Sequence, residues 1–277
     1  MKNYMKLVNF EFNRIAKLFA VLLGVTFVIQ IVGVIVQSRY YLNMANEIMY
    51  EGMLSKSQFL ENYDKISFSQ IMNSMWFLGS IWFCVAAVVF YIFIIWYRDW
   101  IGKNTFIYRL LMLPTTRLNI LFAKITTILI MTLGVVAIQL IMLPIETLLM
   151  KAIVPKEFIR DISVNEIVTI MPEFSFIIPN SPIELVLIYG AGVLAVSILF
   201  TAILMERSFK WKGILGGLIY SAVAVGLMIS PLLINEFFLN GFFYKIEMFV
   251  LEIIMGFLVL AGSIWTCRFL LMKKITV

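Results

Sequence analysis

The sequence predicts an all-α fold, a polytopic membrane protein built as a bundle of six transmembrane helices. Its 277 residues are 62% hydrophobic and only 14% charged, whereas soluble domains are roughly 45–50% apolar and about 25% charged. The apolar residues also gather in runs of about 20 residues, which is the length that crosses a bilayer as a helix. We expect one transmembrane domain over residues 1–277, with spans at 18–37, 71–96, 120–150, 182–205, 213–234 and 246–271.

Composition excludes several other classes of protein. The net charge of +6 comes from basic residues dispersed at the ends of segments, so no nucleic-acid surface is expected. Histidine is absent, and both cysteines, Cys84 and Cys267, lie in or beside apolar runs. We therefore expect no disulfide framework, no metal site and no catalytic residues.

The first 17 residues have the pattern of an amphipathic helix. Such a helix lies along the membrane surface with its cations near anionic headgroups, so we expect an interfacial helix over 1–17. The alternative is that this segment extends the first span into water. One face would carry Tyr4, Val8, Phe12, Ile15 and Phe19, and the other Lys2, Lys6, Asn9, Asn13 and Lys17.

Two polar segments, 38–70 and 151–181, together hold eight of the 16 acidic residues. Each contains the Ser-x-x-Gln/Glu pattern of a helix capping box, at Ser55–Gln58 and Ser163–Glu166, which predicts a short helix in each. Fifteen of the 22 Lys and Arg residues lie on the other side of the spans, together with both termini. By the positive-inside rule the termini are cytoplasmic and the two polar segments are extracellular.

A charged stretch, Arg98 to Arg117, separates the second and third spans. Residues Asn104 to Leu113 have helical spacing, with Phe106, Leu110 and Leu113 on one face and Thr105, Arg109 and Met112 on another. Pro114 ends this helix, because proline disfavours helix in the residue before it. Such a helix either docks in a groove of a soluble partner or lies on the lipid, and spacing alone favours neither.

The fourth span has a marked start, since Ser181, Pro182 and Glu184 supply an N-cap hydroxyl, a proline at the first helical position and an acid in the first turn. The fifth has small residues at four-residue spacing, which allow two helix backbones to approach closely. They either face a second subunit or pack within this chain. These small residues are Gly213, Gly217 and Ser221.

Two acidic residues, Glu146 and Glu252, lie inside apolar spans. A charged side chain at the centre of a bilayer costs at least roughly 2–3 kcal/mol on insertion scales, so such residues usually have a partner or a function. The alternative is that each lies close to the outer interface, where the cost is smaller.

The chain resembles the permease subunit of an ABC-2 type ABC transporter. The resemblance rests on the basic helix before the first span, on six spans with both ends inside, and on the segment YRDWIGKNTFIYRLLMLPTTRLNILFAK, from Tyr97 to Lys124. In that family this segment forms a coupling helix that sits in a cleft of the ATPase subunit. The resemblance implies contact with that subunit by Arg98, Asp99, Phe106, Arg109, Leu110, Leu113 and Pro114.

Its implied partners are a separate ATPase subunit and a second permease copy or paralogue, with the first and fifth spans lining the contact between permeases and the export path. ATP and Mg²⁺ would then be bound by the partner and no cofactor by this chain. The sequence agrees, because the phosphate-binding pattern G-x-x-x-x-G-K-[ST] is missing: Gly102-Lys103 is followed by Asn104, and Tyr97 replaces the first glycine.

We therefore expect a non-enzymatic exporter subunit of the cell membrane that moves a hydrophobic or amphipathic peptide, lipid-like or drug-like substrate, since the spans are almost purely apolar. One alternative is an ion-coupled secondary transporter that uses Glu146 or Glu252, although no inverted repeat is visible. Another is an intramembrane enzyme, which would have few candidate residues.

Overall fold

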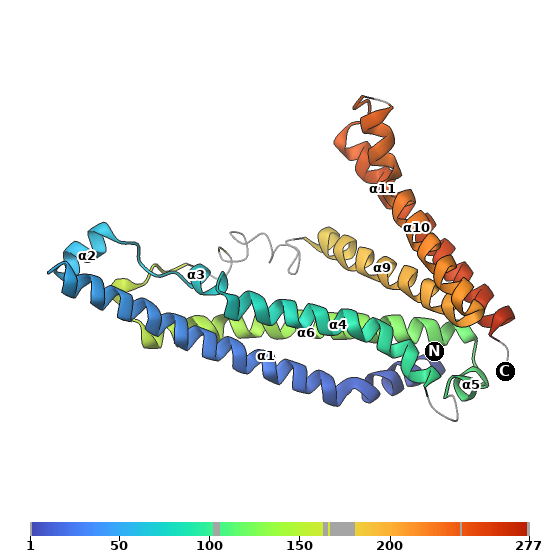
Figure 1. Ribbon diagram of the computed structural model, residues 1–277, viewed down its shortest axis with the longest axis horizontal. Helices are drawn as coiled ribbons and strands as arrows, with labels where there is room; N and C mark the ends of the chain where they lie inside the picture. Colours follow the sequence, from blue (N-terminus) through green and yellow to red (C-terminus); the bar gives the residue numbers. More distant parts are fainter. Residues whose placement is uncertain (1, 102–105, 163–165, 167–180, 239, 276–277) are drawn as a thin grey trace. The chain divides into compact units, whose positions relative to one another are not determined.

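The structure is a computed structural model that describes residues 2–101, 106–162, 166, 181–238 and 240–275. In this part of the chain it is all-helical, and the only β-type pairing is an isolated bridge between Ile66 and Ile159. Six of the helices are long and apolar enough to cross a membrane, which indicates a multi-pass membrane protein. They are α1 (Lys2–Glu51), α4 (Met75–Trp100), α6 (Arg117–Ile153), α9 (Pro182–Phe209), α10 (Trp211–Phe237) and α11 (Lys245–Phe269) (Figure 1).

The shorter elements connect these helices. α2 (Lys56–Asn62) and α3 (Phe68–Met72) lie between α1 and α4, and α5 (Phe106–Leu111) lies between α4 and α6. The 3₁₀ turn η1 (Lys156–Phe158) follows α6, and the π-helical turn η2 (Leu270–Lys274) follows α11.

Local signals set several helix ends as expected. The capping box at Ser55 and Gln58 starts α2, and α5 ends before Pro114. α9 begins at Pro182, where the backbone N–H of Glu184 donates to Ser181 Oγ at 3.2 Å. The second predicted capping box, at Ser163–Glu166, falls largely outside the described residues.

Two expected helix starts differ from the structure. Residue 71, the expected start of the second span, lies in the short helix α3, and Asn73 and Ser74 separate α3 from α4, which starts at Met75. Residue 18, the expected start of the first span, lies within a helix, because α1 is continuous from Lys2 to Glu51. The N-terminal segment therefore extends the first span, which is the alternative reading of its sequence. Val8, Ile15 and Phe19 of the predicted apolar face are buried, whereas Lys6, Asn9, Asn13 and Lys17 of the polar face are exposed.

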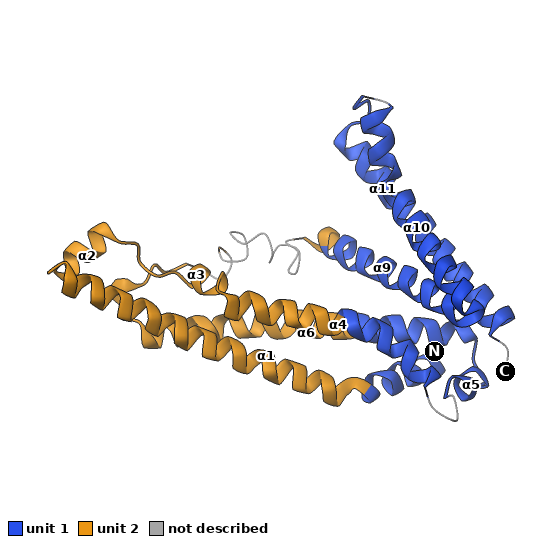
Figure 2. Ribbon diagram, viewed as in Figure 1, with its two compact units in different colours: residues 1–14, 89–129, 185–277 blue, residues 15–88, 130–184 orange. Residues whose placement is uncertain are grey.

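The chain divides into two compact units, and the division falls within α1, α4, α6 and α9 (Figure 2). Unit 1 contains residues 1–14, 89–129 and 185–277, and unit 2 contains residues 15–88 and 130–184. Unit 2 has a continuous apolar core in which α2, α3 and η1 pack on α1 and α6. The core includes Val34, Ala45, Phe59, Phe68, Met72, Phe77, Leu143, Met150 and Phe158.

In unit 1, α9 and α10 form a tight helical hairpin. Lys210 alone connects them, with a positive φ of 55°. A Cβ on Gly213 would lie 2.0 Å from the carbonyl oxygen of Met205, and one on Gly217 would lie 3.0 Å from that of Ala202. Only glycine allows α10 to approach α9 this closely.

Candidate functional site: an ion-pair network beside α5

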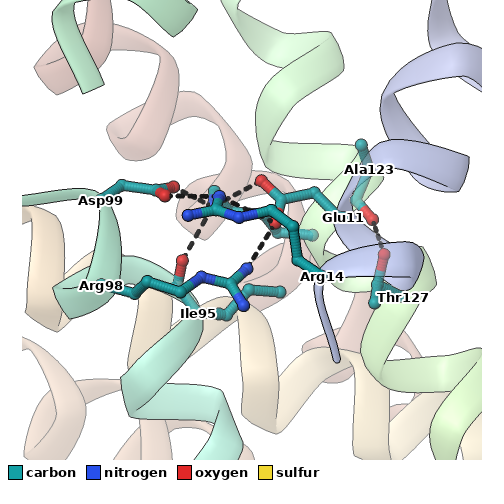
Figure 3. Close-up of polar contacts among 8 residues, drawn as sticks. Glu11, Arg14, Ile95, Arg98, Asp99, Ala123 and Thr127 are labelled. Carbon is teal, nitrogen blue, oxygen red and sulfur yellow. Dashed lines mark hydrogen bonds and ion pairs between the residues drawn. The ribbon is translucent and has the colours of Figure 1, made fainter. Parts of the chain in front are cut away.

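A buried network of charged side chains lies in unit 1, where α1, α4 and α6 meet (Figure 3). α1 contributes Glu11 and Arg14, the last turn of α4 contributes Arg98 and Asp99, and the first turns of α6 contribute Lys124. The network thus joins three segments that are far apart in the sequence.

Lys124 lies at the centre of the network and is fully buried. Its Nζ donates to Asp99 Oδ2 at 2.5 Å, to Glu11 Oε1 at 2.9 Å and to the carbonyl oxygen of Ile95 at 2.8 Å. The ammonium group has three N–H donors, so each has a partner. The same Nζ lies 5.0 Å from the centre of the Trp96 ring, at which distance a cation–π attraction adds to the ion pairs.

Two arginines complete the network from its edge. Arg14 Nη1 lies 2.7 Å from Asp99 Oδ1, and Arg98 Nη2 lies 2.8 Å from Glu11 Oε2. Their side chains are 24% and 22% exposed, against 2% or less for the two carboxylates. The three cations therefore outnumber the two buried anions, and the excess positive charge is carried at the solvent-accessible edge.

The network also contacts the short helix α5. The Arg14 guanidinium lies 5.0 Å from the ring centre of Phe106 in α5 and 5.3 Å from that of Phe10. The two rings stack on each other, with 5.7 Å between their centres. Arg14 thus touches α5 while it pairs with Asp99 of α4.

α5 has a buried face and an exposed face. Ile107, Leu110 and Leu111 are buried, and they fix the helix to unit 1. The outward surface of α5 and the turn after it contains Tyr108 (39% exposed), Arg109, Met112 (71%), Leu113 (41%) and Pro114.

The residues expected to contact a partner therefore fall into two groups. Arg109, Leu113 and Pro114 lie on the exposed surface. Leu110 and Asp99 are buried, so these two side chains do not present a docking face, and Phe106 is partly buried. Arg98 is mostly covered and is paired with Glu11. Met112 and Tyr108 are the exposed apolar residues that the sequence pattern did not select.

The small residues at four-residue spacing in α10 make contacts within this chain. Gly213 and Gly217 are buried against α9, and Ser221 Oγ donates to the carbonyl oxygen of Gly217 at 2.9 Å. Of the two readings of this pattern, the structure supports packing inside one subunit, and these glycines are not free for a second copy.

The two intramembrane acids have different surroundings. Glu146 of α6 is fully buried in unit 2, and neither of its carboxylate oxygens has a hydrogen-bond partner. Glu252 of α11 is only partly buried, and no ion pair forms at it among the residues that the structure describes.

The buried pairing of Glu11, Arg14 and Lys124 was not expected from the sequence. Glu11 is the only acid before Glu47, and it lies on the same helical face as the buried Val8 and Ile15. Lys124 lies inside the predicted third span. A charge of each sign at an apolar position was therefore the available signal of a buried pair.

Side chains that commonly ligate metal ions are not grouped together among the residues that the structure describes. The described ranges contain no group of three or more His, Cys, Asp or Glu side chains able to hold a metal ion. The carboxylates of the network are already occupied by Lys124 and the two arginines, so the network can orient helices but leaves no oxygen free for a ligand.

Comparison of the chain with protein-family models, with curated proteins and with solved structures finds no significant match.

Proposed function

We propose that this chain is the membrane-spanning subunit of an ATP-driven exporter of the cell membrane, and that α5 docks in a groove of a separate ATPase subunit. The observation that carries this proposal is the two-sided character of α5. Its inner face is fixed on unit 1, while Tyr108, Arg109, Met112 and Leu113 lie outward. A short helix that offers aromatic, basic and flexible apolar side chains on one face matches helix-in-groove recognition.

The ion-pair network supports a mechanical role for this helix. Through Arg14, α5 contacts the network, and through Lys124 the network links α1, α4 and α6. Buried charges are strongly penalised when they separate, so these helix ends would move together with α5. ATP hydrolysis on the partner would then be transmitted as a displacement of the spans.

The partners and the substrate follow from the same proposal. ATP and Mg²⁺ are bound by the ATPase subunit, and a second permease copy or paralogue completes the path, with both termini in the cytoplasm. The exposed surfaces of α10 and α11 are almost entirely apolar, which favours a hydrophobic or amphipathic substrate. Gly213 and Gly217 face α9, so the contact between permeases would use other residues of α10.

The decisive experiment is affinity purification of the full chain in mild detergent from its native host, followed by identification of co-purifying subunits and an ATPase assay. Met112→Asp and Leu113→Asp place a charge on the exposed turn that follows α5 without touching the buried face of the helix. We expect at least tenfold less ATPase subunit in these preparations, because an unpaired charge would be buried at the interface.

The matched control is Met53→Asp, since Met53 is 93% exposed in the turn after α1. This variant should retain the ATPase subunit at the wild-type level. Wild-type protein that carries no ATPase, or α5 variants that retain it fully, would overturn the proposal.

One observation favours a second candidate, an ion-coupled secondary transporter. The buried and unpartnered carboxylate of Glu146 is the kind of intramembrane acid that such transporters use. In that case transport by purified protein in vesicles would require an ion gradient and would proceed without ATP.

A further inference from the structure

The interior of unit 2 contains polar layers in which α1, α4 and α6 are in register. Gln30 of α1 donates from Nε2 to Ser80 Oγ of α4 at 2.9 Å and to Gln139 Oε1 of α6 at 3.0 Å. One turn earlier in α1, Thr26 is hydrogen-bonded to Cys84 of α4 at 3.0 Å. In these two layers the buried polar side chains have partners.

The contacts fix the relative directions of the three helices. In α1, Gln30 meets Ser80 of α4, whereas Gly33 meets Trp76, so α1 and α4 are antiparallel. Phe19 of α1 meets Gly134 of α6, and Gln30 meets Gln139, so α1 and α6 run in the same direction.

About two helical turns beyond the Gln30 layer lie Ser38 in α1, Glu146 in α6 and Ser74 just before α4. With a rise of about 1.5 Å per residue, the three positions fall within about one helical turn of one another along the helices. Ser38 continues the buried stripe of Gln30 and Val34, and Glu146 lies between the core residues Leu143 and Met150.

This layer differs from the others because its polar atoms have no partners. Ser38 Oγ, Ser74 Oγ and both carboxylate oxygens of Glu146 are buried and make no hydrogen bond. Ser38 and Glu146 are 0% exposed. Buried polar atoms are normally hydrogen-bonded, and exceptions call for a reason such as a bound ion or water. Of the basic residues closest in sequence, Arg39 is exposed and Lys151 is paired with Asp161.

The chemistry of the layer matches a small monovalent cation. Protonation of Glu146 would remove its charge but leave both serine hydroxyls without partners, whereas a cation satisfies all of these oxygens together. Carboxylate and hydroxyl oxygens are hard ligands. Atoms that share a cation sit at a metal–oxygen distance from its centre, so they need not be hydrogen-bonded to one another. The single negative charge of Glu146 balances one positive charge. A divalent ion would therefore leave one positive charge uncompensated in an apolar core.

We propose that Ser38, Ser74 and Glu146 form a buried binding site for one Na⁺ ion in unit 2. The ion joins α1, α4 and α6 at a level where the side-chain oxygens of Ser38, Ser74 and Glu146 have no hydrogen-bond partner. It supplies the interaction that amide side chains supply in the Gln30 layer. This site does not depend on the ATPase or on the exporter function proposed above.

The test is the thermal unfolding midpoint of the full chain in detergent as NaCl replaces choline chloride at constant ionic strength. An ion that binds only the folded state raises the midpoint with its concentration. We expect a rise of roughly 3–5 °C for each tenfold increase in Na⁺ beyond half-saturation. Binding of ²²Na⁺ should reach one ion per chain.

Glu146→Gln should abolish both the midpoint shift and ²²Na⁺ binding, and Ser38→Ala should weaken binding at least tenfold while leaving the carboxylate in place. The matched control is Glu252→Gln, which removes an intramembrane acid from unit 1 and should respond to Na⁺ as the wild type does. A wild-type midpoint independent of Na⁺, with no ²²Na⁺ bound, would overturn the proposal and leave a protonated Glu146 with bound water. An unchanged Na⁺ response in Glu146→Gln and Ser38→Ala would equally overturn it.

Discussion

Units 1 and 2 both bury acidic side chains among apolar helices, but only those of unit 1 are neutralised by the protein itself. Glu11 and Asp99 share Lys124 and each also contacts an arginine. Glu146 of unit 2 is buried to the same extent and has no partner for either oxygen. The hydrogen-bonded Gln30 layer is intermediate, since it is polar, neutral and satisfied.

The difference shows that burial alone does not tell what a charged residue does in a membrane protein. A carboxylate whose charge is matched by protein cations acts as a structural link between helices. A carboxylate with no protein partner requires something from outside the chain, such as an ion, a proton or water. We therefore expect the loss of stability to differ when one polar side chain is removed from the ion-pair network, from the Gln30 layer or from the layer that contains Glu146.

Lys124→Met should have the largest effect. It removes the central cation and leaves two buried carboxylates with only the edge arginines, and breaking a buried ion pair in this way costs about 3–5 kcal/mol. We expect the thermal unfolding midpoint in detergent to fall by roughly 6–20 °C. Lys212→Met, at an exposed lysine in the first turn of α10, should change the unfolding free energy by less than about 0.5 kcal/mol. Equal midpoints for the two variants would show that the network does not stabilise unit 1.

Gln30→Leu should have an intermediate effect. It removes the donors to Ser80 and Gln139 without creating an unpaired charge, and leaving buried neutral groups unsatisfied costs about 1–3 kcal/mol. The matched control is Gln70→Leu, because Gln70 is exposed in α3. If Gln30→Leu lowered the unfolding free energy as much as Lys124→Met, the charge of the lost side chain would not explain the order of these effects.

Glu146→Gln should have the smallest effect when measured without sodium. It removes a charge that has no partner, so we expect the unfolding free energy to change by less than about 1 kcal/mol or to increase. Asp99→Asn, at a paired carboxylate of unit 1, should be clearly more destabilising under the same conditions. A large loss of stability in Glu146→Gln would mean that this carboxylate has a protein partner in the native membrane.

Much of the fold could be predicted from the sequence. The six spans follow from apolar runs, because a helix is one of the few structures that satisfies the backbone inside lipid. The C-terminal end of α5 and the start of α9 follow from Pro114 and from Ser181 with Pro182, because proline and capping groups act on nearby residues. The continuity of α1 was harder to predict, since an amphipathic first turn is compatible with a separate interfacial helix and with an extended span.

The candidate site was only partly predictable. Its location near the charged stretch between the second and third spans followed from Arg98, Arg109 and their neighbours. Its partners did not, because Glu11 lies 87 residues from Arg98 and 113 residues from Lys124 along the chain. The family resemblance also implied contact with a partner by Leu110, whereas packing on unit 1 buries this side chain.

By itself, then, the sequence determined that this chain is a helical membrane protein with six spans, a short helix before Pro114 and two acids within its spans. Only the tertiary structure decided that Gly213 serves the α9–α10 contact, that Asp99 is matched by Lys124, and that Glu146 is left without a partner. The physical reason is that helix formation depends on neighbours within about a turn, whereas the pairing of buried charges depends on which faces of distant helices meet.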